Sequence, residues 1–444
     1  MRSLSPASGS YASDFLQPLL SAAAAAGASD VHFQPTSAGL SVSWRLDGVL
    51  QPLGVFSPGE RTDVVTRLKV LANLLTYRSD VPQEGRIPVP RASQGSPAME
   101  ARPVPRASQG SPAMEARSME EMQGAAADLS GHREMRVSTF PTLYGERAAV
   151  RLFSRRTDLS RVADLGYAPE TQSWLERALE LTSGAVLITG PAGSGKTTSL
   201  YACLREIVAV SHGSRAVITM EDPIEVAVEG VAQAEVNEAA ELTLSSGFRS
   251  LVRQDPEVMM IGEIRDSESA RAAVAAALTG HLVLSSLHAG SVAEALRRLA
   301  DMRVEEYMLR AGIAGVVNQR LVRRLCDCAR AIAVSSAGAP ELLGLPVAAG
   351  KAPRGCSACL GTGYAGRMLI AEHRCLRTHP IREDCPLPDE QSLPAQQESS
   401  AWAQASHTEF QTMLWRRGLA AVETGQTSPQ ELRRVLGWQG IQRN

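Results

Sequence analysis

The chain has 444 residues, of which 44% are hydrophobic and 21% are charged, and its formal net charge at pH 7 is −2. These values are ordinary for globular proteins, and the length predicts about three domains of roughly 150 residues each. The balanced charge argues against a nucleic-acid partner bound through a broad basic surface. The longest apolar run near the N-terminus, residues 19–28, is shorter than the ~20 residues that span a bilayer. No signal peptide is evident, so we expect a cytoplasmic protein.

Residues 11–155 are predicted to form a small N-terminal α+β domain. Apolar residues recur at helical spacing in two stretches, and short runs rich in β-branched and aromatic residues indicate strands between and after them. The predicted helices and strands are residues 11–27, 31–33, 40–46, 59–75, 136–140 and 148–153.

A duplicated segment interrupts this domain. PVPRASQGSPAMEAR at residues 88–102 is repeated without change at residues 103–117. Two short copies are too few for a solenoid, and their Pro, Ser and Gly content is typical of disordered loops. We therefore interpret about 88–131 as a disordered surface insert, with a peptide docking site as the alternative.

Residues 190–197, GPAGSGKT, fit the pattern G-x-x-x-x-G-K-[ST]. An apolar strand candidate precedes them and a helix candidate, residues 197–210, follows. Such a loop wraps a triphosphate with backbone N–H groups, while the lysine reaches the outer phosphates and the Thr197 hydroxyl ligates Mg²⁺. The sequence thus predicts a site for a nucleoside triphosphate and Mg²⁺. Its predicted nucleotide-binding residues are Gly190, Pro191, Ala192, Gly193, Ser194, Gly195, Lys196, Thr197 and Thr198.

Strand and helix patterns alternate after this loop, which indicates a parallel α/β sheet. Acidic residues follow two of the strands, and the carboxyl ends of parallel strands meet at the edge where ligands bind. Glu263 is predicted to orient the attacking water or hold Mg²⁺ through water, and Glu221 to position metal and water. A surface glutamate and a helix cap are the respective alternatives. His288 ends another strand and is predicted to contact a γ-phosphate.

ITMEDPIE, LVRQDPEVMMIGEIRD and TGHLVLSSLHA, together with the glycine-rich loop, resemble the secretion ATPase superfamily, and within it the type II secretion and type IV pilus assembly motors. The order and approximate spacing of the four boxes match. GASDVHFQP, WRLDGVL and VPQEGRI resemble the N-terminal domain of that family. The resemblance covers residues 12–437 outside the insert. It implies a RecA-like P-loop domain preceded by a smaller, PAS-like α+β domain.

The resemblance also implies a hexameric ring that hydrolyses ATP between the two domains and docks, as a peripheral protein, on an inner-membrane platform. By the same resemblance, such a ring would drive assembly of pilus or pseudopilus subunits. Arginines that neutralise transition-state charge carry over to Arg136 and Arg151 in the N-terminal domain and to Arg249 and Arg253 before the Glu263 strand. Two alternatives stay open. One is a weakly hydrolysing regulatory or scaffold subunit, and the other is a DNA-handling motor of the broader superfamily.

Four cysteines form two close pairs, at residues 326 and 328 and at residues 356 and 359. Four thiolates suit tetrahedral zinc, and in the resembled family a two-pair zinc module distinguishes assembly motors from retraction motors. The first pair here, Cys326-Asp-Cys328, is one residue short of Cys-x-x-Cys. We predict a zinc site, with a module that has lost its metal as the alternative. Cys203, Cys375 and Cys385 are expected to be lone thiols.

The sequence therefore predicts an N-terminal domain, a linker, a RecA-like ATPase domain, a Cys-rich module, a flexible connector and C-terminal helices. The predicted boundaries are 11–155, 156–166, 167–322, 323–372, 373–408 and 409–444.

Overall fold

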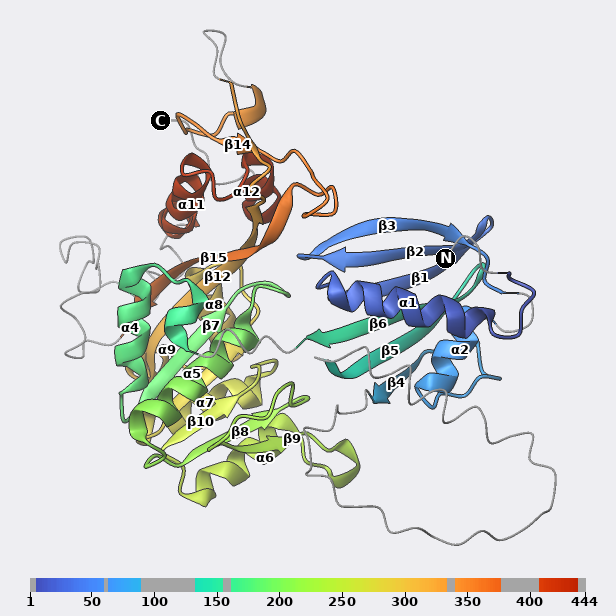
Figure 1. Ribbon diagram of the computed structural model, residues 1–444. Coiled ribbons are helices and arrows are strands. Elements are labelled where there is room, and N and C mark those ends of the chain that lie inside the picture. Colours follow the sequence, from blue (N-terminus) through green and yellow to red (C-terminus); the bar gives the residue numbers. More distant parts are fainter. Residues whose placement is uncertain are drawn as a thin grey trace, which may run out of the picture. The chain divides into compact units, whose positions relative to one another are not determined.

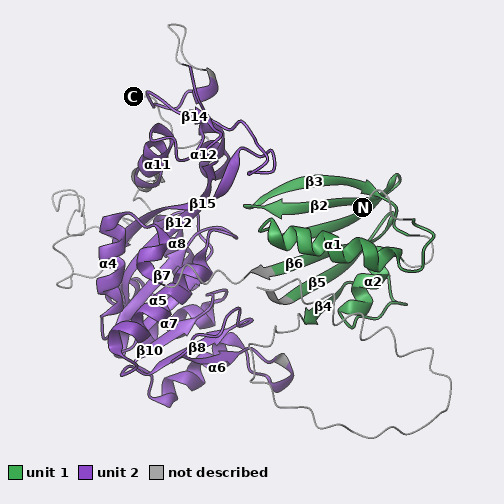
Figure 2. Cartoon of the chain, in the orientation of Figure 1, with its two compact units in different colours: residues 1–156 green, residues 157–444 purple. Residues whose placement is uncertain are grey.

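The computed structural model describes residues 5–59, 63–88, 132–154, 161–333, 340–376 and 407–437. The chain forms two compact units, residues 1–156 and 157–444 (Figure 2). The duplicated insert beyond Pro88, most of the predicted connector and the first residues of the predicted linker lie outside the described residues. The finer division into six segments stays a prediction.

The first unit contains a six-stranded antiparallel sheet in the order β3-β2-β1-β6-β5-β4 (Figure 1). Its strands are β1 (Asp30–Thr36), β2 (Gly39–Leu46), β3 (Val49–Phe56), β4 (Gln83–Pro88), β5 (His132–Thr142) and β6 (Gly145–Ser154). Side chains alternate between the two faces of each strand, so Val31 and Phe33 of β1 share one face. They pack against the helices α1 (Tyr11–Ala25) and α2 (Val64–Leu71) in one hydrophobic core.

The predicted helix at residues 59–75 is shorter than expected. Asp63 has extended backbone angles, and its carboxylate accepts hydrogen bonds from the N–H groups of Val65 and Thr66, both at 3.1 Å, so α2 begins at Val64. Asn73 has a left-handed φ of 55°, which prevents the helix from continuing. The apolar pattern located the helix correctly, but the residues at its two ends make it shorter than predicted.

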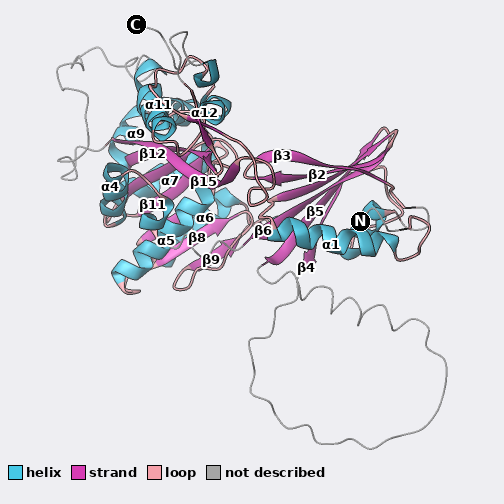
Figure 3. Cartoon of the chain, turned by 45° about the horizontal axis from the view of Figure 1, so that its top comes forward, coloured by secondary structure: helices cyan, strands magenta, loops and turns pink. Residues whose placement is uncertain are grey.

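The second unit contains a seven-stranded sheet in the order β15-β12-β7-β11-β10-β8-β9 (Figures 1 and 3). Its strands are β7 (Gly184–Thr189), β8 (Val217–Glu221), β9 (Ala232–Glu235), β10 (Val258–Ile261), β11 (Leu282–Leu287), β12 (Ile313–Leu325) and β15 (Tyr364–Cys375). All neighbours pair in parallel except the edge strand β15, which is antiparallel to β12. Most of β15 belongs to the segment predicted as a Cys-rich module, but it completes the main sheet.

Helices cover both faces of this sheet. Its helices are α4 (Pro169–Leu179), α5 (Lys196–Ser211), α6 (Leu244–Leu251), α7 (Ser267–Leu278), α8 (Val292–Asp301) and α9 (Glu306–Gly312). Ile188 of β7 lies in the core with α4 and α5, whereas its neighbour Leu187 lies in the opposite core with α7 and α8. Strands β7, β10 and β11 are buried on both faces, which explains their continuous apolar sequence.

The helices α11 (His407–Glu423) and α12 (Pro429–Leu436) lie in the segment predicted to form C-terminal helices, and a short turn separates them. A buried ion pair joins α12 to the end of β12, because Arg323 lies 2.8 Å from Glu431. Tyr364 of β15 adds a hydroxyl contact of 2.7 Å to Ser428, just before α12. One expectation is wrong here: Cys375 is disulfide-bonded rather than a lone thiol.

Candidate functional site

The glycine-rich loop joins the central strand β7 to α5 and fixes its shape through glycines. Gly190, Gly193 and Gly195 have φ values of 151°, 73° and 89°, which side chains rarely allow. A Cβ atom at Gly190 would lie 2.5 Å from both the carbonyl oxygen of Gln319 and the Oγ of Ser194. Gly195 is the N-cap of α5, so the free N–H groups of the first helical turn open at the loop, as anion sites require.

The remaining predicted loop residues surround this turn. Pro191 and Ala192 are exposed, whereas Ser194 is buried and its Oγ has no hydrogen-bond partner. Thr197 and Thr198 lie half-buried in the first turn of α5, directly after Lys196. A buried hydroxyl beside free N–H groups is what a phosphate oxygen would satisfy, so the loop fits the nucleotide phosphates that the sequence predicts.

Three predicted residues meet in one chain of contacts. Lys196 Nζ lies 3.3 Å from His288 Nδ1, and His288 Nε2 lies 2.9 Å from Glu263 Oε1. They meet because β7, β10 and β11 run in parallel, so the residues that follow them lie at one sheet edge. Lys196 Nζ also donates to the carbonyl oxygens of Gly190 and Pro191, at 3.1 and 3.3 Å. Burial lowers the pKa of Lys196, while nearby Glu263 opposes that shift.

An arginine that the sequence reasoning did not select binds the second carboxylate oxygen of Glu263. Arg265 Nε donates to Glu263 Oε2 at 3.1 Å, and its Nη1 donates to Asp222 Oδ2 at 3.0 Å. Glu263 therefore has His288 on one oxygen and Arg265 on the other. The IGEIRD stretch did contain this arginine, two residues after the acid.

Glu221 has different neighbours. It is buried at the end of β8 and accepts hydrogen bonds from Tyr201, Thr219 and Gln233 at 2.5, 2.6 and 2.9 Å. Burial, together with the contact to Glu221, raises the pKa of Tyr201. The structure thus places Glu221 in a separate hydrogen-bond network with these three side chains. It does not join Glu221 to the contacts between Lys196, His288 and Glu263. Its part in metal or water positioning stays a prediction.

The four predicted arginines divide between the two units. Arg249 is exposed on α6 and ion-paired with Glu268, and Arg253 is exposed in the short 3-10 helix Val252–Gln254. Arg136 and Arg151 are direct cross-strand partners on β5 and β6. Their neighbours in each strand belong to the core under α1 and α2, so these two arginines lie on the opposite face of the sheet.

Sequence reasoning missed the residues of β12 that support the loop. Gln319 is fully buried, and its Nε2 donates to the carbonyl oxygen of Ser194 at 2.9 Å. Its Oε1 accepts from Tyr167 at 2.6 Å and from Ser199 at 3.1 Å. Burial raises the pKa of Tyr167, which keeps its hydroxyl a donor. The available signal was a run of three polar residues, Asn-Gln-Arg, within an otherwise apolar strand.

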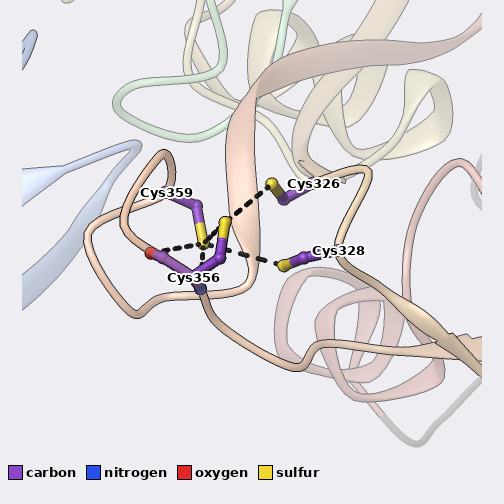
Figure 4. A group of neighbouring side chains, drawn as sticks. All are labelled: Cys326, Cys328, Cys356 and Cys359. Carbon is purple, nitrogen blue, oxygen red and sulfur yellow. Dashed lines mark hydrogen bonds between the residues drawn. The ribbon is translucent and has the colours of Figure 1, made fainter.

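The four predicted metal ligands converge in the second unit (Figure 4). Sulfur separations are 3.8 Å for Cys326 and Cys356, 3.9 Å for Cys328 and Cys359, and 3.7 Å for Cys356 and Cys359. A tetrahedron with Zn–S bonds of about 2.3 Å has sulfurs about 3.8 Å apart. Burial opposes ionisation of Cys359, but N–H groups of Cys356 and Gly363 lower its pKa to about 6. This donor set fits zinc, and the short first pair contributes both of its sulfurs.

The strand order, the loop and the acid and histidine at neighbouring strand ends define a RecA-like P-loop domain. The family model described as "Type II/IV secretion system protein" matches residues 7–102 and 106–434. The chain therefore belongs to the type II/IV secretion system protein family, as its sequence motifs indicated.

Several curated relatives share this family. The putative type II secretion system protein E of Escherichia coli K12 is 35% identical over 430 residues, which cover 95% of this chain and 76% of the relative. The type IV pilus assembly ATPase PilB of Thermus thermophilus is 34% identical over 82% of this chain and 37% of its own length. Type II secretion system protein E of Klebsiella pneumoniae is 37% identical over 78% of this chain and 62% of its own length. The chain thus spans between about a third and three quarters of these relatives.

Two solved structures share the fold. The pilus retraction motor PilT with bound ADP has a TM-score of 0.52 and 20% identity, over 94% of this chain and 96% of that one. The Legionella pneumophila ATPase DotB has a TM-score of 0.60 and 19% identity, with 95% of both chains covered. Within the described residues, no helix is both long and apolar enough to cross a membrane.

Proposed function

We propose that this chain is a Mg²⁺-dependent ATPase subunit of a homo-hexameric motor that drives pilus or pseudopilus assembly. The observation that carries the proposal is the contact chain Lys196–His288–Glu263 beside the glycine-rich loop. It links a phosphate-binding cation to a carboxylate at the edge where parallel strands end. The names of the relatives, type II secretion protein E and pilus assembly ATPase, support the type of motor.

Each residue of the contact chain has a defined task in this proposal. Lys196 Nζ lies beside His288 Nδ1 and His288 Nε2 lies beside Glu263 Oε1, so the imidazole bridges the phosphate-binding lysine and the carboxylate. Glu263, held by Arg265 on its other oxygen, is then an oriented hydrogen-bond acceptor for the attacking water. An incoming phosphate competes for Lys196, which would release His288 to sense the γ-phosphate.

Mg²⁺, when bound, would neutralise phosphate charge, and the Thr197 hydroxyl would help hold it. The remaining charge on the transferring phosphoryl group must be met by arginines. Arg249 and Arg253 belong to the same unit as the loop, whereas Arg136 and Arg151 belong to the other unit. Because the arginine set is split between units, we propose that hydrolysis depends on closure of one unit on the other within the ring.

The motor would work in the cytoplasm against an inner-membrane platform, and nucleic acid is not an expected partner. The four-cysteine cluster would hold Zn²⁺ as a structural ion. A weakly hydrolysing regulatory subunit is the alternative, and the two differ in one measurable property, the rate of phosphate release by the assembled protein.

The test uses the full-length oligomer with Mg²⁺ and ATP. We expect Lys196→Ala to abolish binding of a fluorescent nucleotide and hydrolysis together. Glu263→Gln should bind the nucleotide with unchanged affinity but release phosphate about 100-fold more slowly, because the amide lacks the negative charge and one of the two acceptor oxygens that orient the attacking water. Glu229→Gln, at an exposed acid, is the matched control and should behave as the wild type. Unchanged hydrolysis in Lys196→Ala or Glu263→Gln would refute the motor.

A further inference from the structure

Strand β12 directs consecutive side chains to two different parts of the site. Gln319 supports the glycine-rich loop through the carbonyl of Ser194. Its neighbours Asn318 and Arg320 alternate to the other side of the strand, where both donate to the carbonyl oxygen of Gly290. The same strand therefore contacts the loop that grips phosphate and the turn that follows the histidine.

The turn at Gly290 is held from several directions. Its carbonyl oxygen accepts from Arg320 Nη2 at 2.6 Å and from Asn318 Nδ2 at 3.2 Å. Its N–H donates to Glu294 at 2.6 Å. Gly290 lies two residues after His288, so the position of this turn sets where the imidazole lies relative to Lys196.

A buried carboxylate anchors these donors. Glu372 lies opposite Asn318 in the antiparallel register of β12 and β15, and its Oε1 accepts from Asn318 Nδ2 at 2.9 Å. Asn318, Arg320 and Glu372 are 0%, 9% and 3% exposed. Arg320 Nη1 also donates to Asn318 Oδ1 at 3.0 Å, which closes the group. Buried polar groups that satisfy one another have fixed geometry, so this cluster is a rigid support and not a mobile surface.

We propose that Asn318, Arg320 and Glu372 form a positioning cluster that fixes the Gly290 turn and thereby sets the alignment of His288 with Glu263 for hydrolysis. Gln319, one residue away on the opposite side, positions the phosphate loop instead. The inference rests on the proposed ATPase function. It assigns an effect on turnover to Arg320 and an effect on nucleotide affinity to its neighbour Gln319.

The experiment compares Arg320→Met with Gln319→Met in the full-length oligomer. Arg320→Met removes the shorter of the two side-chain hydrogen bonds to the Gly290 carbonyl oxygen and leaves that of Asn318, while it retains a long apolar side chain. We expect it to lower kcat at least fivefold while the dissociation constant of fluorescent ADP stays within twofold. Gln319→Met should weaken ADP binding at least fivefold, because Ser194 loses its support. Arg320→Lys, which retains one charged donor, should recover part of the lost kcat.

General damage to β12 would change kcat and ADP affinity together in both Met variants, and that result would overturn the proposal. An unchanged kcat in Arg320→Met would also overturn it. If Arg320→Met does not assemble, Arg320→Lys is measured in its place. A lowered kcat with unchanged ADP affinity would then support the proposal, and any other result would overturn it. Absence of hydrolysis in the wild-type oligomer would instead refute the proposed ATPase function, so the two failures are distinguishable.

Discussion

The buried carboxyl group of Glu372 predicts a pH dependence of stability with a definite sign. Burial raises its pKa from 4.5 to about 7, against the opposing effects of the Asn318 hydrogen bond and the charge of Arg320. Charge from Arg417 and the backbone N–H of Leu414 act in the same opposing direction. Between pH 4.5 and 7 the folded chain therefore holds a proton that the unfolded chain releases. The free energy of unfolding must fall as pH rises through this range, by up to about 3 kcal/mol for a shift of this size.

Glu372→Gln removes this titration while its amide oxygen can still accept from Asn318. The wild type loses stability between pH 5 and pH 8 and the variant does not, so the melting temperature of the variant should rise relative to wild type by roughly 5 °C across this range. Adjacent His373 has the opposite effect: burial lowers its pKa to about 4, so it destabilises the fold as pH falls below about 6.5. His373 is common to both proteins and cancels in the difference.

Differential scanning calorimetry at pH 5, 6, 7 and 8, at constant ionic strength, measures this difference. Glu423→Gln is the matched control, because Glu423 is exposed on α11, and its difference from wild type should not vary with pH. A difference for Glu372→Gln that is flat over the range, or that falls with rising pH, would refute the reasoning about burial.

Three further predictions concern other parts of the chain. Gly190→Ala should abolish nucleotide binding in a fluorescence assay because its Cβ would lie 2.5 Å from two atoms, whereas Gly213→Ala, at a left-handed φ of 74° but in open space, should bind normally. Elemental analysis should find one zinc per wild-type chain, and Cys328→Ser should release zinc to a chelator at least tenfold faster; equal rates would contradict the four-ligand site. Lys69→Met should destabilise the first unit by about 3–5 kcal/mol in denaturant unfolding, because Glu146, whose side chain is only 10% exposed, loses its partner, and adding Glu146→Gln should restore part of this.

The parts of the site that follow from strand ends could be predicted from the sequence. Apolar runs identified β7, β10 and β11, and residues after parallel strands meet at one edge, so the proximity of Lys196 and Glu263 followed. The same argument placed Glu221 nearby, but it cannot tell on which side of a strand end a carboxylate points. Glu221 points to Tyr201 and Gln233 instead.

The supporting residues could not be predicted in the same way. Asn318 and Glu372 are separated by 54 positions and meet only because an antiparallel strand closes the edge of a parallel sheet. A polar residue in an apolar strand signals a buried partner, but its identity depends on register, and the sequence of one strand does not determine the register of the next. Pattern reasoning therefore selected residues that the structure brings together at one edge of the sheet and missed those that hold them in place.

The short cysteine pair shows the same distinction between pattern and support. The usual knuckle has two residues between its cysteines, and Cys326-Asp-Cys328 has one, yet its sulfurs lie 3.8 and 3.9 Å from the second pair. The strand before this pair is fixed from outside, because Arg323 is paired with Glu431 and the N–H of Leu325 donates to the carbonyl of Gln426 at 2.8 Å. Strand β12 thus carries Gln319 in its middle and leads directly into Cys326 at its C-terminal end. These contacts hold the C-terminal end of β12 in place. The two cysteines that follow therefore keep the sulfur separations of a tetrahedral site, although one residue fewer lies between them.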